Sequence, residues 1–273
     1  MSVSQPWRGR PGAWGAIALM VLALAGLQGC AHQPPSEAAV EGSAAAPSTD
    51  ARKRAQIRLE LAANYLQAGK TDVALDEVRQ ALLADPGYAD AYHLQGLVYM
   101  ARQDWARADA SLQYALKLRP DDPDVMHNLG WLQCQRGDYA AAQALFARVL
   151  VTPGYASRTK TLMSQGFCYE RAGQLVEAQE ALMHAYEFDA GNPIVGYHLA
   201  SVTFARGDAK RAQFYIRRVN NGEFSNAASL WLGVKVERAL GDTRAMGQLE
   251  EQLHKRYPQS REALALERGA FDE

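Results

Sequence analysis

The chain has 273 residues, of which 48% are hydrophobic and 22% charged, and its 29 basic residues nearly balance its 30 acidic ones. This length accommodates one or two globular domains or a repeat array. The near-neutral charge argues against a nucleic-acid-binding protein with a basic face and against a disordered acidic chain. Three cysteines are too few for a disulfide-framework protein or a cysteine-rich metal fold.

The first thirty residues have the organisation of a bacterial lipoprotein signal peptide. Arg8 and Arg10 form a positive amino-terminal region, and the apolar run over 13–27 is too short to favour a membrane span. The run ends at Leu27-Gln28-Gly29-Cys30, which resembles the lipobox, where a signal peptidase cuts before a Cys that is then acylated. Residues 1–29 are therefore predicted to be removed and Cys30 to carry lipid. A secretory signal followed by an unrelated Cys is the alternative.

The segment after Cys30 predicts a tether. Residues 31–51 are rich in Pro, Ser, Ala and Gly without periodic apolar spacing, so we expect 30–54 to comprise the lipidated Cys and a flexible linker. The two or three acyl chains of a bacterial lipoprotein anchor it stably to a bilayer. By resemblance to Gram-negative lipoproteins, Ala31 in place of Asp favours the outer membrane, with the protein facing the periplasm. The covalent acyl or diacylglyceryl lipid on Cys30 is the only expected non-protein group, and no cofactor is predicted.

From residue 55 onward, helix-like patterns recur with a period of 34, and no stretch shows a convincing strand alternation. Two series of small residues mark the period, and both contain the same two-residue insertion near 157–158. The series are Ala74, Ala108, Ala142, Ala178 and Ala212, and Gly69, Gly137, Gly173, Gly207 and Gly241. The pattern resembles the tetratricopeptide repeat, a helix–turn–helix unit whose small residues let two helices approach closely. The predicted fold is therefore an all-α tetratricopeptide-repeat solenoid.

The period also sets the predicted boundaries. About six repeats form a superhelix over 55–260, at 55–88, 89–122, 123–156, 159–192, 193–226 and 227–260. The sixth is degenerate, because Leu232-Gly233 and Gly241 give registers that differ by one residue. Residues 261–273 are predicted to be a tail or a short capping helix, which the ends of a solenoid need.

The sequence does not contain a pattern that would predict an enzyme or a metalloprotein. Residues 67–71 resemble the end of a phosphate-binding loop, but Asn64 stands where that motif needs Gly. The six histidines form neither an HExxH motif nor a set with cysteines at metal-ligand spacing. We therefore predict no catalytic residue, no metal, no nucleic acid and no small-molecule substrate.

Cys134 and Cys168 lie 34 residues apart, at equivalent positions on the first helices of the third and fourth repeats. The two side chains should therefore be neighbours in the stack. Because the periplasm is oxidising, we expect a disulfide between them. Two buried free thiols are the alternative.

The inner face of the superhelix is predicted to be apolar. On the first helix of each repeat, the second, fifth, ninth and twelfth positions face the concave groove. The apolar residues at these positions, called the groove residues below, are Leu59, Leu66, Leu97, Met100, Trp131, Phe167, Tyr197 and Phe204. The polar ones include Gln56, Asp90, His93, Asp124, His127 and Lys160. Such a surface suits an amphipathic helix or an extended peptide, although neighbouring helices could bury several of these residues in part.

Beyond generic repeats, several segments resemble the type IV pilus biogenesis and stability lipoproteins, the PilF/PilW family. Two of them, His127-Asn128-Leu129-Gly130-Trp131-Leu132-Gln133-Cys134 and Gly166-Phe167-Cys168, resemble the family's third and fourth repeats. The most specific is Ser229-Leu230-Trp231-Leu232-Gly233, followed by Arg238-Ala239-Leu240-Gly241-Asp242 and Tyr257-Pro258-Gln259-Ser260. His127 stands where the family has Asn and Leu129 where it has an aromatic residue. The segment after Arg261 also departs from the family's usual ending.

The resemblance implies a non-enzymatic lipoprotein that binds subunits of the type IV pilus secretin and promotes their outer-membrane localisation and multimerisation. It places the secretin contact near Leu59, Leu66, Leu97 and Met100. A tetratricopeptide lipoprotein adaptor that recruits cell-wall hydrolases or envelope-assembly proteins is the alternative.

Overall fold

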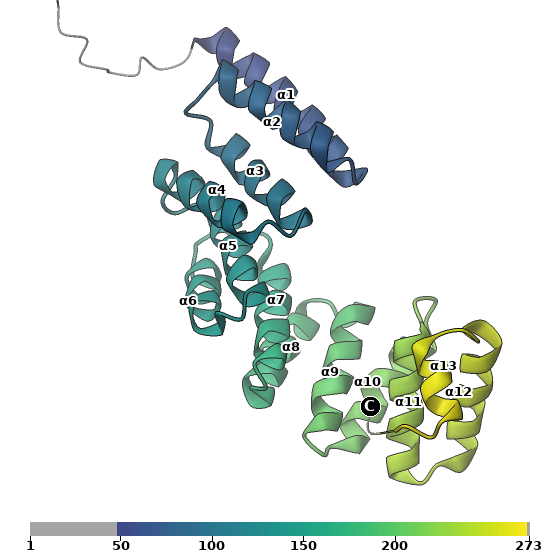
Figure 1. Cartoon of the computed structure of the whole chain (residues 1–273). Coiled ribbons are helices and arrows are strands. Elements are labelled where there is room, and N and C mark those ends of the chain that lie inside the picture. The colour runs from purple at the N-terminus through teal and green to yellow at the C-terminus, as the bar shows by residue number, and fades with distance from the viewer. Residues whose placement is uncertain (1–47, 272–273) are drawn as a thin grey trace, which may run out of the picture. The chain divides into compact units, whose positions relative to one another are not determined.

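A computed structural model describes residues 48–271, which form thirteen α-helices and no strand (Figure 1). Twelve of the helices pair into six helix–turn–helix hairpins. The first helices of the hairpins are α1 (Thr49–Gln67), α3 (Ala89–Ala101), α5 (Pro123–Gln135), α7 (Arg158–Arg171), α9 (Pro193–Ala205) and α11 (Ala227–Leu240). The second helices are α2 (Thr71–Ala84), α4 (Trp105–Leu118), α6 (Tyr139–Leu150), α8 (Leu175–Phe188), α10 (Ala209–Asn220) and α12 (Thr243–Arg256). The all-α repeat architecture predicted from the sequence is confirmed.

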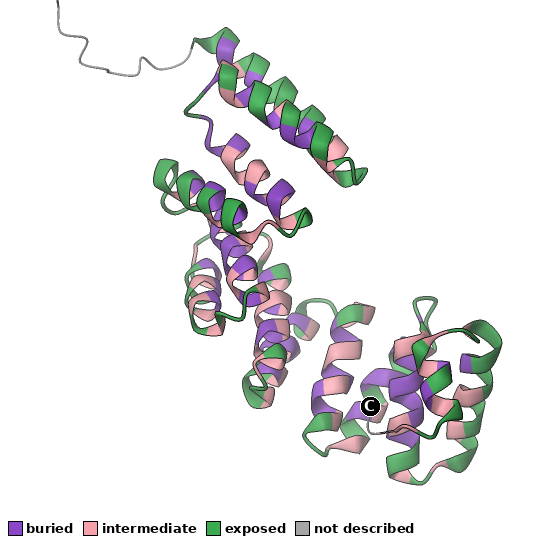
Figure 2. Ribbon diagram, viewed as in Figure 1, coloured by how far each residue is buried: buried purple, intermediate pink, exposed green. Residues whose placement is uncertain are grey.

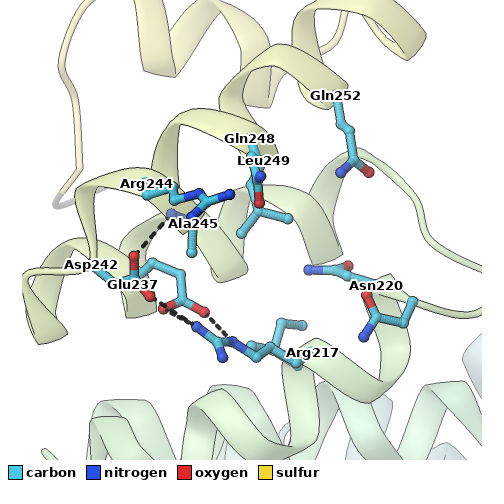
Figure 3. A pocket seen from close by; sticks show the side chains of 11 residues that line it. Arg217, Asn220, Glu237, Asp242, Arg244, Ala245, Gln248, Leu249 and Gln252 are labelled. Carbon is cyan, nitrogen blue, oxygen red and sulfur yellow. Dashed lines mark hydrogen bonds and ion pairs between the residues drawn. The ribbon is translucent and has the colours of Figure 1, made fainter.

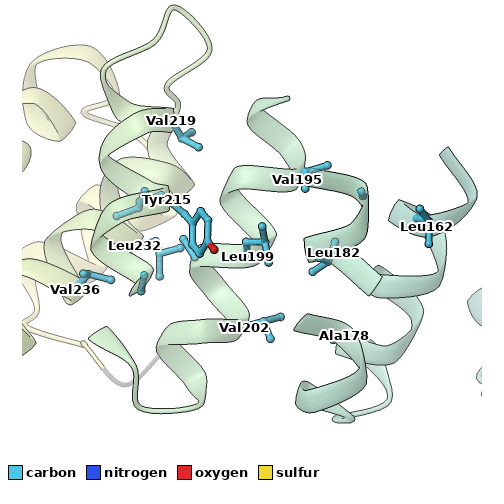
Figure 4. Packing of buried hydrophobic residues seen from close by; sticks show 14 residues of the cluster. Leu162, Ala178, Leu182, Val195, Leu199, Val202, Tyr215, Val219, Leu232 and Val236 are labelled. Atoms are coloured by element: carbon cyan, nitrogen blue, oxygen red, sulfur yellow. The ribbon is translucent and has the colours of Figure 1, made fainter. Parts of the chain in front are cut away.

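The hairpins stack in chain order. Each first helix contacts its own partner and, from α1 to α9, the first helix of the next repeat. Buried residues therefore recur along most of the helices (Figure 2), whereas α12 has only Leu253 buried. The apolar core is continuous across repeat boundaries, as one cluster shows by running from Leu162 on α7 through Leu182 and Leu199 to Val236 on α11 (Figure 4). No helix among residues 48–271 is both long and apolar enough to cross a bilayer.

The turn inside each hairpin depends on one left-handed residue. Gly69, Gly137, Gly173, Gly207 and Gly241 have φ between +73° and +84°. At the same position of the second repeat stands Gln103, with φ +59°. A side chain is costly in this conformation, which explains why the glycine series recurs at this spacing.

The small residues of the first helices allow close packing of the two helices in a hairpin. A Cβ atom on Gly96 would lie 2.6 Å from Leu112 Cγ, and one on Gly166 would lie 2.6 Å from Leu182 Cγ. Gly130 is similarly placed, since its Cβ would come within 2.9 Å of Phe146 Cε1. These contacts explain why glycine recurs at equivalent positions of the second, third and fourth repeats.

The predicted boundary between tether and solenoid was wrong. Residues 49–54, assigned to the tether, are the first turns of α1, which begins at Thr49 with the Ser48 hydroxyl accepting a hydrogen bond from the Ala51 backbone N–H at 3.2 Å. Ala51 and Ala55 are buried, and Arg52 forms an ion pair with the buried carboxylate of Asp85. The buried side chains of this turn are alanines. Because the turn lacks large apolar residues, the hydrophobic pattern of the sequence did not indicate a helix here. The predicted signal peptide, Cys30 and the tether up to residue 47 lie outside the described residues.

The described segment after the sixth repeat, up to residue 271, folds against that repeat. α13 (Arg261–Glu267) begins after the capping residue Ser260, whose hydroxyl accepts a hydrogen bond from the Ala263 backbone N–H at 3.1 Å, and the helix packs on α11 and α12. The rings of Trp231 and Phe271 stack with centroids 5.2 Å apart. Of the two expectations for this segment, the capping helix is the one that the structure contains.

Candidate functional site: a half-buried groove and a pocket at its end

All eight groove residues lie on first helices and are half-buried. Seven of them pack against buried apolar clusters. Leu59, Leu66 and Met100 contact the clusters of the first repeats, and Trp131 contacts the cluster that contains the two cysteines. Phe167, Tyr197 and Phe204 contact the cluster that runs from α7 to α11. The neighbouring helices therefore cover part of each side chain. What remains accessible is a series of apolar edges rather than whole side chains.

His127 was expected among the polar groove residues, but it is buried, with only 2% of its surface exposed. Its Nδ1 is hydrogen-bonded to Thr161 Oγ1 at 2.9 Å, and the Thr161 hydroxyl donates to the Tyr155 hydroxyl at 3.3 Å. Burial lowers the pKa of His127 to about 4, with smaller contributions from Lys160 and His93. The residue is therefore a neutral link between α5 and α7 and not a charged group in the groove.

Other polar contacts join successive first helices and hold the aromatic residues. Asn128 Nδ2 lies 2.7 Å from His93 Nε2, which links α3 to α5. Between α7 and α9, Glu170 accepts from His198 Nδ1 at 2.6 Å and from the Ser201 hydroxyl at 3.0 Å. The His198 ring also packs on Phe167, with centroids 4.1 Å apart. These contacts fix the spacing of the helices that carry the groove residues.

The structure contains the disulfide between Cys134 and Cys168 that their spacing predicts, with a Cα–Cα distance of 5.7 Å. It joins α5 to α7 inside a cluster that includes Phe146 and the partly buried Trp131. The disulfide therefore fixes two first helices next to the longer connection 151–157, which contains the predicted insertion.

One groove residue, Tyr197, also lines a pocket that the sequence did not reveal, called the terminal pocket below. It has a volume of about 540 Å³, and α9, α11 and α13 line it. Its polar and aromatic lining residues are Tyr197, Ser201, Trp231, Lys235, Arg261, Glu262 and Arg268. Tyr197 is the one groove residue among them. Periodicity could not predict this pocket, because α13 lies outside the repeat.

A second cavity, of about 350 Å³, lies between α10 and α12 (Figure 3). On its floor the buried Glu237 accepts two hydrogen bonds from Arg217, at 2.7 and 3.0 Å, and one from Gln213 at 2.7 Å. The bonds to Glu237 raise the pKa of Arg217. These hydrogen bonds pair the Glu237 carboxylate with the Arg217 guanidinium, so they neutralise the buried charge and hold α10 to α11. Among the described residues, no group of three or more His, Cys, Asp or Glu is placed to hold a metal ion.

The chain is similar in sequence to tetratricopeptide-repeat proteins. Two family models described as tetratricopeptide repeat match residues 59–123 and 99–153. The type IV pilus assembly protein PilF of Pseudomonas aeruginosa is 24% identical over 204 residues, which cover 75% of this chain and 81% of PilF.

Solved structures extend this similarity. The crystal structure of PilW, described as a widely conserved type IV pilus biogenesis factor, matches with a TM-score of 0.73 at 26% identity, over 78% of this chain and 97% of that one. A structure of P. aeruginosa PilF shares the fold, with a TM-score of 0.72 at 22% identity over 81% of this chain and 99% of that one. The chain is therefore a tetratricopeptide-repeat solenoid protein, homologous to PilF and matching PilW in structure.

Proposed function

We propose that this protein is a non-enzymatic, lipid-anchored scaffold of the outer membrane that binds the type IV pilus secretin and promotes its localisation and multimerisation. The observation that carries the proposal is the match to PilW, which extends over 97% of that chain and 78% of this one. A match over 78% of this chain extends well beyond a single repeat. The sequence similarity to PilF supports a role in type IV pilus biogenesis independently.

The groove residues are the proposed contact with the secretin. Leu59, Leu66, Leu97 and Met100 lie on α1 and α3, and each leaves part of an apolar side chain accessible. A row of apolar edges on successive first helices suits an amphipathic helix or an extended segment of a partner. Because the core clusters hold most of these side chains, little conformational entropy would be lost when a partner binds.

The proposed anchor is the acyl group on Cys30. The first described helix begins at Thr49, so the linker between anchor and solenoid is shorter than the sequence suggested. If residues 31–47 form the tether that their composition predicts, it would span about 20–25 Å on average. The solenoid would therefore work close to the inner surface of the outer membrane.

A deletion strain complemented with variants tests the proposal. We expect the wild-type protein to co-purify with the secretin from detergent extracts and to restore secretin multimers on gels. Cys30→Ser should move the protein to the soluble periplasmic fraction and reduce the outer-membrane multimers. Leu59→Glu combined with Leu97→Glu should weaken co-purification while the chain stays folded and anchored.

The controls separate this function from the adaptor alternative. Leu83→Glu alters a side chain of α2 that is already 75% exposed, so it adds a carboxylate outside the groove and should not affect secretin binding. Recovery of cell-wall hydrolases without secretin would favour the adaptor. Normal multimers and normal twitching motility in the deletion strain would refute the proposal.

A further inference from the structure

We propose that the cavity between α10 and α12 binds an extended segment of a partner polypeptide through its main chain. Its walls come chiefly from the second helices of the fifth and sixth repeats, whereas the groove residues lie on first helices. The cavity would therefore be a second site for a polypeptide, and it does not depend on the proposed function of the groove.

The charged groups of the cavity balance one another. Two arginines, Arg217 and Arg244, and two carboxylates, Glu237 and Asp242, line it. Arg217 donates to both carboxylates, and the second oxygen of Asp242 accepts from the Ala245 backbone N–H at 3.0 Å. Because the positive and negative charges cancel and both carboxylates already have partners, the cavity favours a neutral ligand over an ion.

Carboxamide side chains supply the remaining hydrogen-bonding capacity. Asn220 Nδ2 donates to the Ser229 carbonyl at 3.0 Å, while Asn220 Oδ1 is buried and accepts no hydrogen bond from residues 48–271. Asn221, Gln248 and Gln252 also line the cavity, are exposed, and have no hydrogen-bond partner in that part of the chain. Each carboxamide can both donate and accept. A ligand with N–H groups would satisfy the buried oxygen, which is costly to leave unpaired.

The spacing of the polar side chains on α12 matches an extended peptide. Arg244, Gln248 and Gln252 are four residues apart, so they lie on one face of the helix, about 6 Å apart along its axis. In an extended peptide, the N–H and C=O groups of every second residue point to the same side and recur about every 6.5–7 Å. Successive side chains of α12 can therefore meet successive main-chain groups of the ligand.

The shape and the walls of the cavity also suit a polypeptide main chain. Figure 3 shows Gln248 and Gln252 on one wall and Arg217 and Asn220 on the other. The volume of about 350 Å³ is near the lower end of the range for ligand cavities, which fits a short stretch of main chain. Among the described residues that line the cavity there is no aromatic ring, so a sugar would lack a surface on which to stack.

Titration of the ¹⁵N-labelled mature chain, followed by NMR, tests the proposal. The chain carries Cys30→Ser, so that no lipid is attached, and has its disulfide formed. The probe is a neutral pentapeptide of alternating Ser and Val, acetylated and amidated at its ends. We expect the side-chain amide signals of Asn220, Gln248 and Gln252 to shift and to saturate in the millimolar range. A copy methylated at every peptide nitrogen cannot donate main-chain hydrogen bonds and should bind about tenfold more weakly.

Two pairs of glutamines provide matched variants. Gln248→Ala combined with Gln252→Ala removes two carboxamides from exposed positions of α12 and leaves a strong helix former at each. This double variant should bind the peptide about tenfold more weakly. The control combines Gln80→Ala with Gln113→Ala, at exposed positions of α2 and α4 that do not line the cavity. It should stay within about twofold of wild type. Circular dichroism checks that both double variants fold.

Several results would overturn the proposal. The absence of saturable shifts at about 10 mM peptide would show that the cavity does not bind a main chain. Equal binding of the methylated copy, or equal weakening in the control variant, would contradict recognition through these carboxamides. A saccharide probe, N,N′-diacetylchitobiose, tests the other ligand class, and shifts that match those of the peptide would assign the cavity to sugars. None of these measurements involves the secretin, so their failure leaves the proposed function unaffected.

Discussion

Gly166 of α7 and Leu182 of α8 approach so closely that a Cβ atom on residue 166 would lie 2.6 Å from Leu182 Cγ and 3.3 Å from the Leu182 backbone nitrogen. Leu182 is fully buried, and its side chain belongs to the cluster that runs from α7 to α11. The leucine therefore cannot move aside without disturbing the next repeat. The separation of the two helices is fixed by the absence of a side chain at residue 166.

Gly166→Ala should consequently destabilise the protein by about 1–3 kcal/mol, because the added methyl group overpacks the hairpin. Urea denaturation of the mature chain followed by circular dichroism measures the change. Gly247→Ala is the control, since Gly247 lies on α12 with no atom within 4 Å of a Cβ there. It should be neutral or stabilise the helix by about 1 kcal/mol. Equal effects at both positions would show that helix propensity, and not contact with Leu182, sets the result.

Gln103 carries the left-handed conformation that glycine adopts in the turns of the neighbouring repeats. Gln103→Gly should therefore raise stability by about 0.5–1 kcal/mol, a gain limited by the greater freedom of glycine in the unfolded chain. The converse change Gly137→Ala, at φ +84°, should destabilise by about 1 kcal/mol. A shift of the urea midpoint in the same direction for both variants would contradict the explanation.

The disulfide between Cys134 and Cys168 closes a loop of 34 residues. Replacing both cysteines by serine should lower the free energy of unfolding by about 3–4 kcal/mol, and reductant should lower that of the wild type similarly. Intact mass after alkylation, with and without reductant, counts the free thiols. Two alkylated thiols in the unreduced mature protein would show that the bond does not form, and unchanged stability in reductant would show that it does not stabilise the stack.

The fold was predictable where the sequence repeats. The glycine and alanine series revealed the period because the turn and the tightly packed helix interior each tolerate few residue types, as Gly137 and the fully buried Ala142 illustrate. The start of α1 was not predictable, since Ala51 and Ala55 are buried without forming a large apolar pattern. The capping helix lies outside the repeat, and its position could not be derived from the period.

The groove was predictable only as a set of positions. The eight apolar groove residues lie on the expected helices, but the period could not tell how far neighbours would cover them. His127 shows the limit most clearly. Its ring is hydrogen-bonded to Thr161, one period later, and is buried instead of being exposed in the groove. The terminal pocket combines residues of two repeats with α13, and Tyr197 was the only member that the period identified.

The buried His127 should make stability depend on pH. Its pKa is about 4 in the folded protein and near 6.5 in the unfolded chain, so the unfolded chain binds more protons between these values. The stability contributed by the neutral ring is complete above pH 6.5 and is lost as the pH falls towards 4. The full loss is about 3 kcal/mol. His127→Asn should reduce the slope of stability against pH between 5 and 6.5. His93, whose pKa burial also lowers, should maintain a smaller slope in the same direction. An unchanged slope in the variant would mean that another group controls the acid sensitivity of the protein.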